Sequence, residues 1–186
     1  MNQPPPPDGT VRVLLLSKEE NFVSILNIWS PKTRNYELQT NMPYTYKYPR
    51  PALTVDCVIF QKSKKANQVL LIQRAFPPFE GKWALPGGFI EMDERLIDAA
   101  KRELKEETGL ENMDIRQFFT FDKIDRDPRG RTISVVFTGI FESTPPPLMA
   151  ASDATEARWF DLKKLPELAF DHEEILEFAT KILNLK

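Results

Sequence analysis

The sequence has one cysteine and one histidine among its 186 residues. The lone cysteine, Cys57, excludes an intramolecular disulfide and a cysteine-rich zinc site. Because Cys57 lies in an apolar run, we expect its thiol to be buried in the core. The lone histidine, His172, leaves little room for a histidine-based metal site or a Ser-His-Asp triad.

The sequence also lacks long hydrophobic runs and an excess of one charge. No stretch approaches the roughly 20 apolar residues of a membrane span. The N-terminus has no basic region followed by an apolar core, so we do not interpret it as a secretory signal. A formal net charge of −2 gives no field that would steer nucleic acid or membrane. We therefore expect a soluble, cytoplasmic protein that binds neither.

Glycine is scarce, and its distribution is uneven. Four of the seven glycines lie in or beside one stretch, which suggests unusual backbone geometry there: Gly81, Gly87, Gly88 and Gly109. The stretch contains a predicted helix, with Asp93 as a candidate N-cap and Gly109 as a candidate left-handed residue at its C-terminal end. Its apolar face combines Leu96, Ile97, Ala100 and Leu104.

Three glutamates of this helix, Glu103, Glu106 and Glu107, share a face that overlaps the edge of the apolar stripe. Glutamates that only improve solubility would lie on the far side. Like charges at this spacing repel by about a few tenths of a kcal/mol per pair, and the helix dipole disfavours anions in the last turn. A hard cation such as Mg²⁺ would offset these costs. The glutamates alone leave open an exposed helix with many salt bridges.

The full pattern resembles the Nudix box. Gly88 is followed by five residues, Glu94, seven residues and then Arg-Glu-Leu-Lys-Glu-Glu-Thr-Gly-Leu over 102–110, with every fixed position matched. The resemblance implies an α/β (α+β) fold, an α/β/α sandwich with a mixed sheet between helices. It also implies a loop–helix–loop metal site that hydrolyses a nucleoside diphosphate linked to another group.

By this resemblance, Mg²⁺ (or Mn²⁺) is the cofactor and the ligand positions are Gly88 (through its carbonyl), Glu103, Glu106 and Glu107. Glu94, Arg102 and Gly109 are structural parts of the box. On a helical wheel Arg102 points away from the carboxylates, so we expect it to form ion pairs within the box. One glutamate or aspartate must act as the general base, and the box does not identify it. Asp153, after a proline-rich loop, is a further candidate, unless it is only a turn residue.

Softer motifs at 52–56, 125–131 and 168–172 resemble the ADP-ribose pyrophosphatase branch, which forms AMP and ribose 5-phosphate. The candidates to hold phosphate or ribose are Arg74, Arg126, Arg129 and Arg131. Phe76, Phe79 or Phe121 could stack on adenine, although core packing is the commoner role. The run at 125–131 also fits a solvated hairpin turn. His172 is expected to open or cap the last helix beside Asp171, with catalysis as the alternative.

The chain is expected to have three parts. Residues 1–10 form a proline-rich disordered tail, residues 11–48 form an extension packed on the core or on a second subunit, and residues 49–186 form the Nudix domain. We expect a strand at 11–16 and further strands at 52–60, 69–74, 115–121, 132–141 and 157–160. A helical turn at 162–166 and a helix at 172–185 follow. A homodimer is left open.

The predicted function is Mg²⁺-dependent hydrolysis of ADP-ribose. The alternatives are hydrolysis of other nucleotides (modified nucleoside triphosphates, dinucleotides or NADH) and a non-catalytic sensor of an ADP-ribose-type ligand. Such sensors carry a winged helix downstream and tend to lose box residues. Here the box is whole and the chain ends right after the last helix, so we expect an enzyme. A fused adenylyltransferase would need a longer N-terminal region.

Overall fold

The computed structural model describes residues 12–15, 24–27, 47–63, 66–149 and 154–185. The chain divides into two units, Met1–Thr45 and Tyr46–Lys186. In the first unit, β1 (Arg12–Leu15) pairs antiparallel with β2 (Ser24–Asn27), which confirms the strand expected at 11–16. The predicted tail at 1–10 and most of the extension at 11–48 lie outside the described residues.

In the second unit, seven of the described strands form one mixed sheet, in the order β5-β4-β3-β8-β7, with β6 on β3 and β9 on β4. Its long central strands β3 and β8 run parallel, and the other pairings are antiparallel. The strands are β3 (Ala52–Gln61), β4 (Gln68–Arg74), β5 (Trp83–Ala84), β6 (Gly87–Phe89), β7 (Arg116–Phe121), β8 (Thr132–Phe141) and β9 (Ala154–Asp161).

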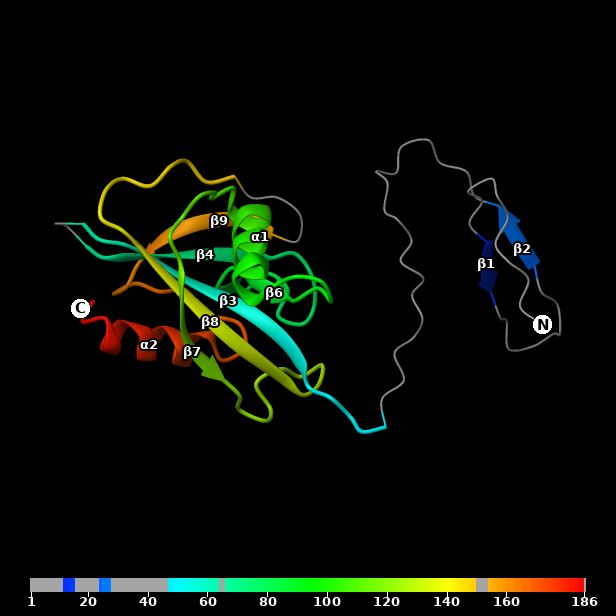
Figure 1. Ribbon diagram of the computed structural model, residues 1–186. Coiled ribbons are helices and arrows are strands. Elements are labelled where there is room, and N and C mark those ends of the chain that lie inside the picture. The colour runs from blue at the N-terminus through cyan, green and yellow to red at the C-terminus, as the bar shows by residue number, and fades with distance from the viewer. Residues whose placement is uncertain (1–11, 16–23, 28–46, 64–65, 150–153, 186) are drawn as a thin grey trace. The chain divides into compact units, whose positions relative to one another are not determined.

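Two helices, α1 (Leu96–Thr108) and α2 (His172–Ile182), lie on opposite sides of this sheet (Figure 1). Alternate residues of β3 therefore enter different core clusters. Cys57 and Ile59 pack on the α1 side with Leu104, whereas Val58 and Phe60 pack on the α2 side with apolar residues of that helix, including Ile175, Leu176 and Ala179. Burial on both faces explains why β3 reads as a nearly continuous apolar run. The predicted α/β/α sandwich is confirmed.

The five strands predicted in the second unit are confirmed as β3, β4, β7, β8 and β9, and α2 confirms the last helix. The short strands β5 and β6 were missed, because two or three residues beside proline and glycine give no strand periodicity. The predicted helical turn at 162–166 is wrong. Lys164 N–H donates to the Asp161 carbonyl at 2.9 Å and closes a simple turn.

Helix α1 begins later than the sequence suggested. Its N-cap is Arg95, which makes no side-chain capping bond, so the prediction of Asp93 as the cap is wrong. The reason lies in the preceding turn, where the Glu94 carboxylate accepts the Glu91 N–H and pairs with Arg102. The other end is confirmed, because Gly109 has φ 74° and its N–H bonds the Lys105 carbonyl. Within the described residues, no helix has the length and apolarity that crossing a membrane requires.

Candidate active site

A pocket of about 610 Å³ lies where β3, β6, α1 and the loop before β8 meet. All three glutamates that the sequence singled out, Glu103, Glu106 and Glu107, line it. They are not splayed into bulk solvent. Glu107 is 6% exposed, while the Glu106 side chain is 48% exposed at the rim.

The glycines of β6 lie directly against these carboxylates. The Gly87 N–H donates to Glu107 Oε2 at 2.8 Å, which fixes the orientation of that buried carboxylate. A Cβ at Gly88 would come 2.4 Å from Glu103 Oε1, and one at Gly87 would come 2.1 Å from the Val55 carbonyl oxygen. Only glycine therefore lets this backbone, with its carbonyl groups, approach the acidic face of α1.

Arg102 forms hydrogen bonds to three glutamates of the box, Glu94, Glu103 and Glu106. Its guanidinium donates to both oxygens of Glu94 (2.7 and 3.0 Å), and its Nη1 donates to Glu103 at 2.7 Å and to Glu106 at 3.3 Å. It thus forms the expected ion pairs within the box. The expectation that it points away from the carboxylates is wrong, because a wheel places only Cα directions while this long side chain reaches back over its neighbours.

The same contacts set the protonation of the acids. Hydrogen bonds from Arg102 lower the pKa of Glu94. Burial raises the pKa of Glu103, and Arg102 offsets this only in part. The site therefore contains one carboxylate that is firmly ionised beside a more basic one.

The donor set fits a hard divalent cation. Carboxylate oxygens from Glu103, Glu106 and Glu107, with the Gly88 carbonyl beside them, are ligands that Mg²⁺ and Mn²⁺ accept. In the described part of the chain, no three acidic, histidine or cysteine side chains form a ready-made cage. Instead, the positive Nη1 of Arg102 lies between Glu103 and Glu106. A divalent cation would compete for the same oxygens.

Two of the predicted arginines, Arg74 and Arg126, form hydrogen bonds to other groups of the protein. Arg74 lines the pocket, donates to the carbonyls of Phe76 and Pro78, and packs 4.9 Å from the Phe170 ring centre. Arg126 is buried at the pocket floor, where it holds Asp171 through two bonds of 2.7 and 2.9 Å. Its guanidinium is thus already engaged with protein carboxylates.

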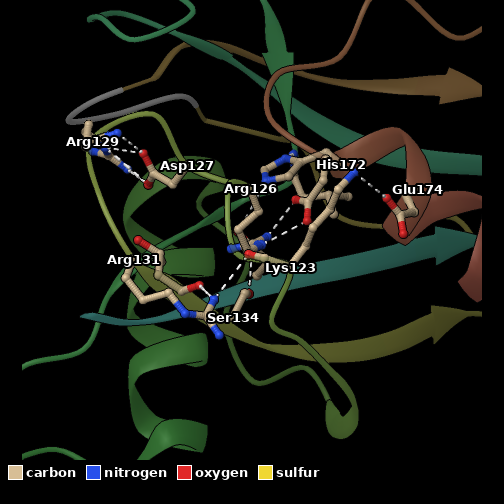
Figure 2. A network of polar contacts seen from close by, with 12 residues as sticks. Lys123, Arg126, Asp127, Arg129, Arg131, Ser134, His172 and Glu174 are labelled. Carbon is tan, nitrogen blue, oxygen red and sulfur yellow. Dashed lines mark hydrogen bonds and ion pairs between the residues drawn. The ribbon is translucent and has the colours of Figure 1, made fainter. Parts of the chain in front are cut away.

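The other two arginines differ in position. Arg129 lines the pocket, held by bidentate bonds to buried Asp127, and its guanidinium lies 5.0 Å from the Phe89 ring centre and 5.6 Å from that of Phe170. Arg131 is not among the described residues that line the pocket, and its Nη1 donates to the carbonyls of Lys123 and Thr132. Figure 2 shows Arg129 with Asp127 on one side and Arg126 near His172 on the other.

The three aromatic candidates, all among the described residues, also differ in position, and only Phe76 lines the pocket. Phe76 lines the pocket and is 59% exposed. Phe79 packs edge-on against Phe170 at 4.8 Å, and Phe121 packs in the cluster on the α2 side. Asp153 lies outside the described residues, so its candidacy stays a prediction.

Sequence reasoning named the motifs at 52–56 and 168–172 but assigned no site role to Phe89, Thr54, Asp56 or Phe170, and it gave His172 a catalytic role only as an alternative. Phe89 and Phe170 form part of the wall, and Thr54, Asp56 and His172 form the floor. The available signal was an acid inside the apolar run of β3, since a buried charge needs partners that a sequence does not display. His172 is indeed the first residue of α2, as expected.

The comparisons with known proteins agree on a family. The NUDIX domain family matches residues 50–179. The ADP-ribose pyrophosphatase of Methanocaldococcus jannaschii is 47% identical over 130 residues, which are 70% of this chain and 73% of that protein. The ADPR responsive transcriptional repressor NtrR of Acinetobacter baylyi is 35% identical over 145 residues, 75% of this chain but 57% of the repressor.

Among solved structures, the NUDIX domain of Shewanella oneidensis NrtR complexed with ADP ribose is similar, with a TM-score of 0.69 and 33% identity. The match covers 79% of this chain and 98% of that one. The fold, the box and the comparisons therefore indicate the same family.

Proposed function

The chain belongs to the Nudix domain family of hydrolases, and we propose that it cleaves ADP-ribose to AMP and ribose 5-phosphate in the presence of Mg²⁺. The observation that carries the proposal is one pocket whose lining combines Glu103, Glu106 and Glu107 with Arg129 and aromatic rings. The 47% identity with an ADP-ribose pyrophosphatase supports the choice of substrate.

The three glutamates and the Gly88 carbonyl would hold the cation. When bound, Mg²⁺ neutralises phosphate oxygens and lowers the pKa of a coordinated water. The protein contributes the orientation of the ligands: Gly87 N–H fixes Glu107, and Arg102 keeps Glu103 and Glu106 near one another. Mn²⁺ would fit the same oxygen donors.

A carboxylate must take the proton of the attacking water. Glu103 is one candidate for this role, because its carboxylate lines the pocket beside the other two glutamates. Glu106, Glu107 and Asp153 are the alternatives that we proposed from the sequence.

Arg129 and the aromatic rings of the lining would bind the nucleotide. Asp127 orients Arg129 through bidentate bonds, so the guanidinium can meet a phosphate or ribose oxygen with little loss of side-chain entropy. Phe89 and Phe170 offer ring faces for adenine beside it, and exposed Phe76 offers another. Arg74 and Arg126 would shape the site from behind, and we propose no substrate contact for Arg131.

The test is AMP release from ADP-ribose by purified protein with Mg²⁺, and its loss with a chelator. Glu106→Gln and Glu107→Gln should each lower kcat by about a hundred-fold or more while the protein stays folded. The matched control is Glu111→Gln, because Glu111 is an exposed acid just beyond the helix that pairs with Lys105. Full activity in both box variants would refute the metal assignment.

A panel of NADH, diadenosine polyphosphates and modified nucleoside triphosphates tests the choice of substrate. Faster hydrolysis of any of these than of ADP-ribose would overturn it while leaving the reaction class intact.

The second candidate function is sensing, because a 35% identical relative is an ADPR responsive repressor. A sensor would bind ADP-ribose without releasing AMP, so calorimetry and product analysis on the same sample separate the two functions. The cytoplasmic location, the homodimer and the absence of a nucleic-acid partner stay predictions. Light scattering and a DNA-shift assay test the last two.

A further inference from the structure

A cluster of buried polar groups lies at the floor of the pocket. Asp56 of β3 accepts a hydrogen bond from Ser134 of β8 and lies 3.6 Å from Arg126, which holds Asp171 at the start of α2. His172 completes the cluster, with Nε2 3.7 Å from Asp56 Oδ1. Figure 2 shows His172, Arg126 and Ser134 of this cluster. The mechanism proposed above uses none of these groups for chemistry.

His172 has a defined protonation state. Its Nδ1 is 2.9 Å from the Leu85 backbone nitrogen, and because an amide N–H can only donate, Nδ1 accepts. The neutral ring then carries its proton on Nε2, toward Asp56. Burial lowers the pKa of His172, although the charges of Asp56 and Asp171 oppose this. The lowered pKa agrees with a neutral ring whose Nδ1 accepts the Leu85 N–H.

The backbone that His172 holds leads straight to the metal-site glutamates. Leu85 packs in the core cluster on the α2 side, and two residues later the Gly87 N–H donates to Glu107 of α1. Between them, the Pro86 carbonyl accepts the Cys57 N–H at 2.7 Å. A short extended segment is thus tied to α2 at one end and to the acidic face of α1 at the other.

We propose that His172 is a positioning residue: by accepting the Leu85 N–H, it fixes the segment 85–88 so that the Gly87 N–H holds Glu107 oriented for a divalent cation. The part that concerns the cation rests on the proposed function. The tether between His172, Leu85 and Gly87 does not. It gives α2, whose first residue lies 87 positions from Leu85 in sequence, a defined influence on the box.

The experiment compares His172→Asn with His172→Gln. The Asn carbonyl oxygen can take the place of Nδ1, whereas the Gln oxygen lies one bond farther from the backbone. In metal-free protein, we expect amide hydrogen exchange at Leu85 and Gly87 to be about ten-fold faster in the Gln variant and near wild type in the Asn variant. Val136, buried in β8, reports global opening.

A kinetic arm follows AMP release against Mg²⁺ concentration. The Gln variant should need about ten-fold more Mg²⁺ for half-saturation, with KM for ADP-ribose within about two-fold of wild type. The Asn variant should behave like wild type. A merely structural role would lower Tm without moving the Mg²⁺ requirement of the folded enzyme.

Two results would overturn the proposal. One is faster exchange at Leu85 with no change at Gly87, because the tether requires both amides to respond together. The other is equal behaviour of the Asn and Gln variants. If the Gln variant does not fold, amide hydrogen exchange in the wild type and the Asn variant still tests the proposal. A Leu85 N–H that is protected from exchange while the Gly87 N–H is unprotected would contradict the tether. If the wild type hydrolyses nothing, the proposed function fails while the exchange result stands.

Discussion

Substitution of Gly87 by alanine tests whether the contact between β6 and β3 holds the site together. Gly87 and Gly130 offer a matched pair, because their φ angles are 158° and 157°. A Cβ at Gly87 would come 2.1 Å from the Val55 carbonyl oxygen and 2.8 Å from Asp56 Oδ1, whereas a Cβ at Gly130 would meet nothing within 4 Å. The backbone cost is shared, so the difference between the variants isolates the steric contact.

The expected magnitudes follow from those distances. Gly130→Ala should lose about 1–3 kcal/mol, the cost of a side chain in a conformation that glycine favours. Gly87→Ala adds overpacking of about 1–3 kcal/mol, because the Val55 oxygen belongs to a central strand that cannot move aside. It also strains the Gly87 N–H bond to the Glu107 carboxylate, a contact of a kind that contributes about 1.5–3 kcal/mol. We expect Gly87→Ala to be less stable than Gly130→Ala by about 3 kcal/mol.

Urea denaturation of both variants at neutral pH measures this difference directly, and Tm should differ by about 6–12 °C in the same direction. Gly87→Ala should also lose most of its activity, because Glu107 loses its orienting donor. If the two variants agree within about 0.5 kcal/mol, β6 can shift freely and the close packing of Gly87 on β3 does not hold the site.

Further predictions concern Arg129 with its partner Asp127 and the helix end. Arg129→Ala should raise KM for ADP-ribose about ten-fold with little change in kcat, while Arg131→Ala, outside the pocket lining, should leave both unchanged in steady-state kinetics. Burial alone raises the pKa of Asp127, but hydrogen bonds from Arg129 outweigh it and the pKa falls. The stability from this pair is complete above about pH 4 and is lost below it, so Asp127→Asn should flatten the acid limb of a Tm–pH profile. Gly109→Ala should cost about 1 kcal/mol in denaturation, because Gly109 ends α1 with φ 74°.

The half of the site that the sequence predicted lies within one continuous motif. Glu103, Glu106 and Glu107 share a helix face by spacing alone, and all three line the pocket, with Glu107 buried and Glu106 exposed at the rim. Glycine at 87 and 88 signalled an unusual backbone, although not which atoms it approaches. Local spacing sufficed here because helix periodicity fixes the relative directions of neighbouring residues.

The other half depends on contacts between distant elements. His172 lies 87 residues from Leu85, and Arg126 lies 45 residues from Asp171, so neither pairing leaves a periodic trace in sequence. Arg126, Arg129 and Arg131 come from one short loop, yet one is buried, one lines the pocket and one bonds backbone carbonyls outside it. Composition cannot separate them, because the direction of each side chain follows from loop geometry.

Arg102 shows how the chain tolerates its own acidic cluster. The sequence argument held that three neighbouring glutamates carry a cost that a hard cation would offset, with an exposed helix of many salt bridges as the alternative. In the structure the guanidinium of Arg102 supplies a positive charge to Glu103 and Glu106. Hydrogen bonds to Glu94 and Glu103 in turn raise the pKa of Arg102. The acidic cluster therefore has a counter-charge from the protein itself. A cation that binds Glu103 Oε1 and Glu106 Oε2 would displace Nη1, so part of its binding free energy would replace an existing ion pair, and Glu94 could retain the displaced guanidinium.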